Sequence, residues 1–158
     1  MADQKKIEQA KKVFKLIQDA MDGMKWKYNV KDEYHIETGA RGDDLPIELN
    51  VSVDPDKALI MVISHIPVVV SEDKRIDVAM AVTYINNILV NGCFDYDISS
   101  GYCFFRMCNS YLDSYIGADV VKYMLLVSCQ TIDEYNDKLL MIAKDMMTIQ
   151  QFIASEDK

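Results

Sequence analysis

Apolar side chains occupy every second position of Leu45-Pro46-Ile47-Glu48-Leu49-Asn50-Val51-Ser52-Val53. A period of two is that of a β-strand, in which successive side chains point to opposite faces of a sheet. One apolar face and one polar face indicate an antiparallel sheet that packs on a core with one side only. The turn sequence Asp54-Pro55-Asp56-Lys57 follows, and the apolar run 58–66 predicts a second, more central strand beyond it.

Further helices and strands are predicted on both sides of this segment. Residues 3–21 predict an amphipathic helix, and 24–30 and 34–38 alternate as strands before the turn-rich residues 39–44. A helix is predicted from Ser71 or Asp73 to about residue 90, where Asn91-Gly92 ends it. The hairpin 93–109 turns at Ser99-Ser100-Gly101.

The last third of the sequence predicts one long helix over residues 118–153. Nine of ten positions at alternating four- and three-residue spacing from Val121 to Ile153 are apolar. Thr131 and Glu134 resemble a capping box that would divide the helix, but the register continues through them, which favours one helix. Such a helix would be about 50 Å long, so part of its apolar stripe is expected to protrude or to face a second subunit.

The predicted order is therefore α-β-β-β(β)-α-β-β-α. Strands joined by short turns imply an antiparallel sheet, here of five to six strands, with three helices packed on it. The fold class is α+β. At 158 residues, without repeats or linkers, the chain is expected to form a single domain, residues 1–158.

Composition excludes several classes of function. The net charge is −8, which opposes binding to nucleic acid and to anionic membranes. Four cysteines lack the spacing of a metal site or a disulfide framework, so we expect free, buried thiols, no metal and no cofactor. The free thiols and the charged, apolar-poor residues 1–12 point to a cytoplasmic protein without a signal peptide.

A short motif in the second half of the chain resembles the YbjN-like family. It runs from Asn87 through Asn91-Gly92-Cys93-Phe94 and Gly101 to Phe104-Phe105-Arg106. The element order is similar to the fold of type III secretion chaperones, to which that family is structurally related. The resemblance implies a small, acidic bacterial protein, non-enzymatic and often dimeric, that holds a partner polypeptide or serves regulation. It supplies no catalytic residues; Phe94 is expected in the core, and Arg106 is expected to pair with an Asp across the hairpin.

Candidate catalytic and ligand-binding residues are better explained by folding. His35 and His65 lack an orienting group or a nucleophile, and we expect both to be exposed strand residues. Arg41-Gly42-Asp43 has the composition of a hairpin loop. The acidic residues Asp54, Asp56, Glu72 and Asp73 lack the spacing of a calcium loop. Gly117-Ala118-Asp119 lacks the lysine of a phosphate-binding loop.

Two apolar segments are the candidate partner or dimer surfaces. One lies between a strand and a helix and the other follows the hairpin; their candidate residues are Ile66, Val68, Val69, Val70, Tyr111, Leu112, Tyr115 and Ile116. Core packing or an exposed patch would each account for them. We therefore expect a non-enzymatic protein-binding module, chaperone-like or regulatory, that forms a homodimer and binds another protein or a second copy of itself. The alternatives are a small-molecule-binding or enzymatic domain with an unrecognised site, and a structural subunit of a complex.

Overall fold

The computed structural model describes residues 3–157 and contains one antiparallel sheet of six strands in those residues, in the order β1-β2-β3-β4-β6-β5. The strands are β1 (Tyr28–Asp32), β2 (His35–Arg41), β3 (Pro46–Asp54), β4 (Leu59–Val69), β5 (Cys93–Asp97) and β6 (Tyr102–Ser110). The helices are α1 (Gln4–Gly23), the 3-10 turn η1 (Glu72–Lys74), α2 (Arg75–Ile88), α3 (Ala118–Ala143) and α4 (Ile149–Glu156). The predicted α+β class and the antiparallel sheet are confirmed.

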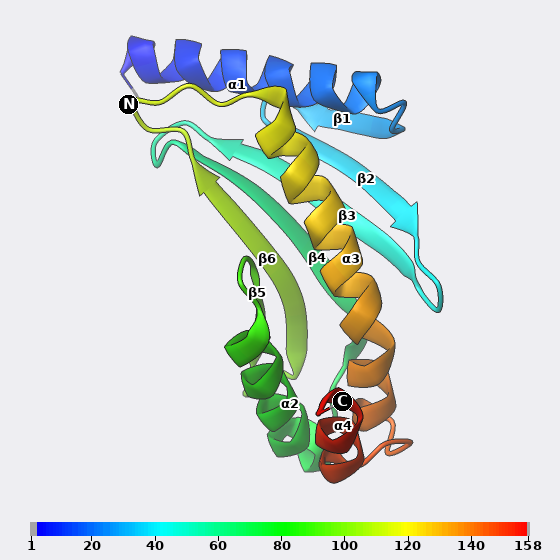
Figure 1. Cartoon of the computed structure of the whole chain (residues 1–158). Helices are drawn as coiled ribbons and strands as arrows, with labels where there is room; N and C mark the ends of the chain where they lie inside the picture. The colour runs from blue at the N-terminus through cyan, green and yellow to red at the C-terminus, as the bar shows by residue number, and fades with distance from the viewer. Residues whose placement is uncertain (1–2, 158) are drawn as a thin grey trace.

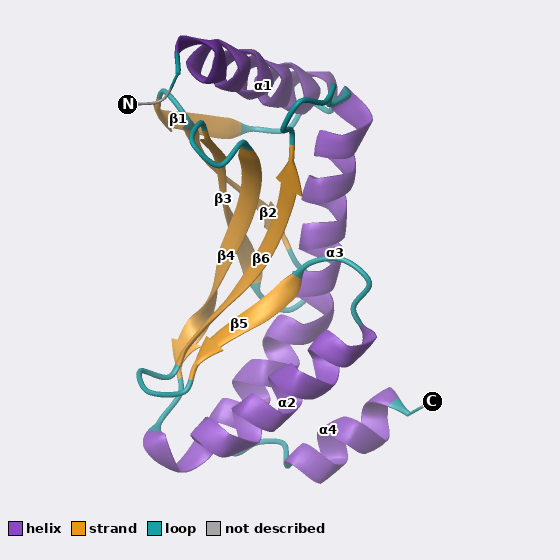
Figure 2. Ribbon diagram, turned by 90° about the vertical axis from the view of Figure 1, so that its left-hand side faces the viewer, coloured by secondary structure: helices purple, strands orange, loops and turns teal. Residues whose placement is uncertain are grey.

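The helices gather on one side of the sheet. Helix α1 lies across one end of the molecule, α3 runs along the sheet, and α2 and α4 lie at the other end (Figure 1). Seen from the side, no helix of residues 3–157 covers the opposite face, which we call the open face (Figure 2). The core therefore lies between one sheet face and the helices.

Strand β3 shows why the period of two determines this arrangement. Ile47, Leu49, Val51 and Val53 are each less than 5 % exposed, whereas Glu48 and Asn50, which alternate with them, are exposed. Val51 lies opposite Val62 of β4, so apolar side chains of neighbouring strands meet on the same face. Burying each aliphatic side chain is worth about 1.5–3 kcal/mol, which fixes the register of the sheet.

The hairpin β5–β6 joins the sheet through β6, which pairs with β4 and leaves β5 at the edge. Phe94 is buried and lies opposite Phe105, with ring centroids 5.3 Å apart. The turn needs glycine at Gly101, because its φ is +80° and an added Cβ would lie 2.3 Å from the carbonyl oxygen of Val70. The expected core position of Phe94 is confirmed.

The prediction of one continuous helix over residues 118–153 is wrong. Helix α3 ends at Ala143, Asp145 adopts a left-handed φ of 60°, and α4 begins after Thr148. Thr148 and Gln151 form a reciprocal capping box, whereas Thr131 and Glu134 lie inside α3. Folding back packs Phe152 of α4 against Tyr84 of α2, with ring centroids 5.8 Å apart. The chain therefore has four helices within the described residues instead of three.

Candidate interaction surfaces

The segment from Ile66 to Val70 contains both buried and exposed side chains, because it forms the end of β4 and then enters the loop beyond it. Ile66 and Val70 are buried, and Val68 is partly buried against the core. Val69 is 56 % exposed and lies opposite Tyr102 of β6, which is 55 % exposed. Together with His65 and Pro67 they line a shallow hollow of about 310 Å³. Only the alternate residues of this segment can therefore contact a partner.

The segment from Tyr111 to Ile116 also contains both buried and exposed side chains. Tyr111 is 1 % exposed, and its hydroxyl donates a hydrogen bond to the carbonyl oxygen of Asp54 (3.0 Å). Burial raises the pKa of Tyr111 to about 12. Ile116 packs against the core, while Leu112 and Tyr115 are 60 % and 92 % exposed. Of the four predicted residues, only Leu112 and Tyr115 are thus well placed to meet another molecule.

Helix α2 carries an exposed apolar stripe that sequence reasoning missed. Ile76 is 61 % exposed and Met80, one turn later, is 48 % exposed. They line a hollow of about 510 Å³ with Tyr84 and with Ile153 of α4, and we call this surface the α2 face. Residues 78–94 contain no charged side chain. That charge-free run is the sequence signal that could have located the surface.

The open face of the sheet carries a second set of residues that the sequence analysis did not single out. Met61 and Ile63 of β4 and Phe104 of β6 are partly exposed on it. Beside them, Arg106 forms an ion pair with Asp95 across the hairpin (Nε to Oδ2, 2.8 Å), as predicted. Strand alternation places these residues away from the core, and the sequence could not show that no helix of residues 3–157 covers them.

Both histidines are exposed residues of the open face, as expected. His35 contacts the carboxylate of Asp32 at 2.7 Å. His65 lies beside the ring of Phe104, with ring centroids 5.9 Å apart. His35 is opposite Ser52, which is opposite Met61, and His65 lies four residues further along β4. The two histidines are therefore separated by roughly 14 Å along the strands and 10 Å across them, too far to share a site.

The four thiols are free, but the prediction that all four are buried is wrong. Cys103 is buried, whereas Cys108 is exposed, because neighbouring odd and even positions of β6 point to opposite faces. Burial raises the pKa of Cys103 to about 12 and that of Cys129 to about 11, and desolvation also raises the pKa of Cys108. These three thiols are protonated at neutral pH and are poor nucleophiles.

Residues 3–157 contain neither a cluster of side chains that could bind a metal ion nor a helix that could span a membrane. The His, Cys, Asp and Glu side chains described there form no group of three that could hold a metal ion. Asp54 instead accepts the backbone N–H groups of Asp56 and Lys57 in the β3–β4 turn. None of the described helices has the length and hydropathy needed to cross a membrane.

Comparisons with known proteins identify the fold. No family model and no curated protein matches the sequence. YbjN from E. coli, described as a candidate transcription regulator, is similar with a TM-score of 0.59 and 10 % identity over 83 % of this chain and 92 % of that one. A chain of the HopA1–SchA chaperone–effector complex has a TM-score of 0.53 and 11 % identity over 78 % and 91 % of the two chains. A chain of the ExsC–ExsE complex has a TM-score of 0.53 and 11 % identity, over 80 % and 94 %. The chain therefore has the YbjN-like fold, which it shares with type III secretion chaperones.

Proposed function

We propose that this chain is a non-enzymatic protein-binding module, chaperone-like or regulatory, that acts as a homodimer. The comparisons support the binding of a polypeptide, since two of the similar chains come from complexes, one of them a chaperone with its effector. Fold alone does not give function, so the proposal rests on the surface of this chain.

The observation that carries the proposal is the α2 face. A two-fold interface brings the same patch of both copies together, so any charge near its centre meets the same charge. With a net charge of −8, two copies repel each other over most of their surface. The α2 face offers exposed Ile76 and Met80 within a helix that is uncharged from Val78 onward. It is therefore suited to a second copy of this chain.

The chemistry of the reactive side chains supports a non-enzymatic role. Three of the four thiols have raised pKa values, and the two histidines lie far apart on the open face. Acid–base or nucleophilic catalysis requires such groups within hydrogen-bond reach of each other. The free cysteines agree with the reducing cytoplasm of a bacterium, which is the compartment we propose.

Sedimentation velocity of the full chain, measured from low to high micromolar concentration, tests the proposal. We expect a species with twice the mass of one chain, whose fraction rises with concentration and does not fall at high salt, because apolar contacts hold it. A chain that remains monomeric at high micromolar concentration would refute the dimer. A catalytic activity that survives extensive purification and is lost on mutation of one residue would refute the non-enzymatic role.

A further inference from the structure

The apolar stripe of α3 continues in the same register into α4, across a break in the helix. Nine of ten positions at alternating four- and three-residue spacing from Val121 to Ile153 are apolar. That spacing passes through residues 144–148, which are not helical and separate α3 from α4; we call them the hinge. A helical hairpin does not require a common register, because its loop sets the rotation of the second helix independently. The sequence is therefore compatible with a straight helix through the hinge as well as with the hairpin.

The hinge places an aspartate where glycine is usual. The backbone N–H of Met146 donates to the carbonyl oxygen of Met141 (2.8 Å), and that of Asp145 donates to the carbonyl oxygen of Ile142 (3.1 Å). This is the Schellman arrangement that ends a helix, and Asp145 occupies its left-handed position with a φ of 60°. A Cβ makes that conformation unfavourable, whereas the lysine and the two methionines around Asp145 favour a helix. Backbone preference at Asp145 therefore opposes the turn, and contacts made by α4 hold it closed.

Side chains of α2 and α3 hold α4 in its place. A helix of eight residues is too short to be stable on its own in water. Phe152 is fully buried and packs against Tyr84 of α2, whose hydroxyl donates to the carboxylate of Asp157 (2.7 Å), the C-cap of α4. Lys138 of α3 forms an ion pair with Glu156 (Nζ to Oε1, 2.5 Å), and only 24 % and 10 % of these side chains are exposed. All of these contacts join α4 and its C-cap to α2 or α3, so the same segment of a second copy would satisfy the same groups.

The ion pair between α3 and α4 also fits a two-fold relation between two copies. Glu156 lies beside Lys138, so α4 folds back along the end of α3. When two straight helices lie antiparallel about a two-fold axis, contacting residues are equally distant from the axis along the sequence. The midpoint of residues 138 and 156 is residue 147, which lies in the hinge. Two copies with opened hinges can therefore exchange α4 symmetrically, and only the hinge has to change its conformation.

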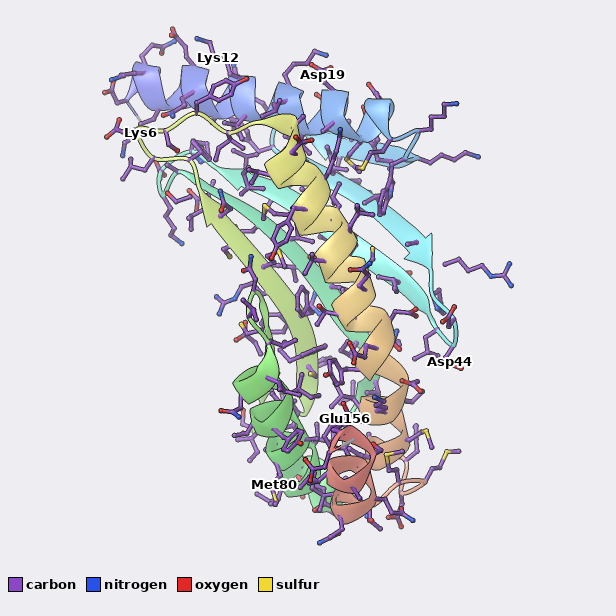
Figure 3. The ribbon with its side chains drawn as sticks, viewed as in Figure 1. Lys6, Lys12, Asp19, Asp44, Met80 and Glu156 are labelled. Carbon is purple, nitrogen blue, oxygen red and sulfur yellow. The ribbon has the colours of Figure 1, made fainter. Side chains whose placement is uncertain are left out.

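We propose that two copies of this chain exchange α4, so that each α4 packs against α2 and α3 of the other copy. In the exchanged dimer the hinge is helical, whereas a single copy folds back at Asp145. Met80 on α2 and Glu156 on α4 lie at the same end of the molecule (Figure 3). The α2 face includes Ile153 of α4, so exchange builds each α2 face from both copies. This inference rests on the proposed homodimer and names the segment that each copy supplies.

Exchange retains the contacts of α4 and changes those of the hinge. Asp145 leaves the left-handed region, which is favourable for a residue with a Cβ. Its ion pair with Lys74 is lost, but the Asp145 side chain is 73 % exposed, and exposed pairs contribute little to stability. The balance between the folded-back and the exchanged form is therefore set by the hinge backbone and by protein concentration, since exchange needs two copies.

Two charge reversals in the full chain test the exchange directly. Lys138→Glu and Glu156→Lys each place like charges together, both within one chain and between two copies of the same variant. In a mixed dimer of the two variants, exchange of α4 restores two pairs of opposite charge, whereas folding back restores none. The variants, one of them isotope-labelled, are mixed in urea and refolded. Native mass spectrometry should then show mixed dimers in about fivefold or greater excess over their statistical share.

Lys122→Glu mixed with Asp119→Lys is the matched control. These two residues form an ion pair within α3, and their reversal changes the net charges of the two chains by the same amounts. Their mixture should give the statistical share, because exchange of α4 does not restore this pair. The control therefore separates pairing at the exchanged site from simple attraction between chains of different net charge.

Asp145→Ala and Asp145→Gly form a second, independent test at the hinge. Both remove the carboxylate and its ion pair with Lys74, so only the backbone preference differs between them. Glycine favours the left-handed turn, whereas alanine favours the helix. Sedimentation velocity should therefore give a dimer dissociation constant at least about tenfold lower for Asp145→Ala than for Asp145→Gly. Urea denaturation checks that both variants fold.

Two results would each overturn the exchange: mixed dimers at their statistical share, and equal dissociation constants for the two Asp145 variants. An excess of mixed dimers that the Lys122 and Asp119 control reproduces would also overturn it. In each of these cases a dimeric wild type would leave the proposed homodimer standing. A wild-type chain that stays monomeric at high micromolar concentration would instead refute the homodimer and the exchange together.

Discussion

Met80→Glu should dissociate the proposed dimer without unfolding the subunit. Met80 keeps 48 % of its side chain exposed in the isolated chain. Burying a whole methionine is worth about 1.5–3 kcal/mol, so covering the remaining half contributes roughly 1 kcal/mol per copy and 2 kcal/mol per dimer. That loss alone corresponds to about a 30-fold weaker dimer, and enclosing two carboxylates weakens it further.

The subunit itself should be little affected by Met80→Glu. Glutamate and methionine have similar helix propensities, and the site is half exposed, so the free energy of unfolding should change by less than about 0.5 kcal/mol. Sedimentation velocity over a dilution series measures the dissociation constant, and urea denaturation measures the stability. Leu126→Glu is the matched control, because Leu126 of α3 is also 48 % exposed. A dissociation constant that is unchanged in Met80→Glu, or equally raised in Leu126→Glu, would refute the assignment of the α2 face.

Phe152→Ala should lower the free energy of unfolding by roughly 3–5 kcal/mol in urea denaturation, because its ring is fully buried, whereas the exposed Gln150→Ala should stay within about 0.5 kcal/mol. Gly101→Ala should cost more than about 1 kcal/mol in the same assay, because of its positive φ and the nearby oxygen of Val70; a smaller loss would show that the turn tolerates a side chain. Hydrogen bonds from Ser100 and Ser99 lower the pKa of Asp97 from 3.8 to about 2, so its stabilising contribution is complete above about pH 4 and is lost as pH falls toward 2. The melting temperatures of wild type and Asp97→Asn should therefore converge over that range; a constant difference would contradict the cause.

Sequence alone predicted those strands and turns that are encoded by the spacing of apolar residues within one short segment. The alternation of Ile47, Leu49, Val51 and Val53 determined β3, and the same rule assigned the β5–β6 hairpin with its turn at Gly101. These predictions succeeded because the period of side chains along one element shows which face is apolar. The order of elements, together with the short motif, was enough to anticipate the fold.

The candidate surfaces could be predicted less well, because exposure depends on what covers an apolar residue. Val69 and Val70 are neighbours of the same type, yet Val69 is 56 % exposed and Val70 is 1 % exposed. Tyr111 and Tyr115 differ in the same way. Local sequence contains the pattern of apolar residues, but the covering elements come from distant parts of the chain.

The helical pattern of residues 118–153 shows most clearly what the sequence determined and what tertiary structure decided. Sequence determined that both parts are helical and apolar on one face, because that depends on spacing alone. Tertiary structure decided that the chain folds back at Asp145, because a straight continuation would leave Phe152 in water, whereas the turn buries it against Tyr84. In the same way, the lysines of α1 can be seen in the sequence, but only the packing of the distant Tyr115 segment beside α1 forms the hollow that several of them line.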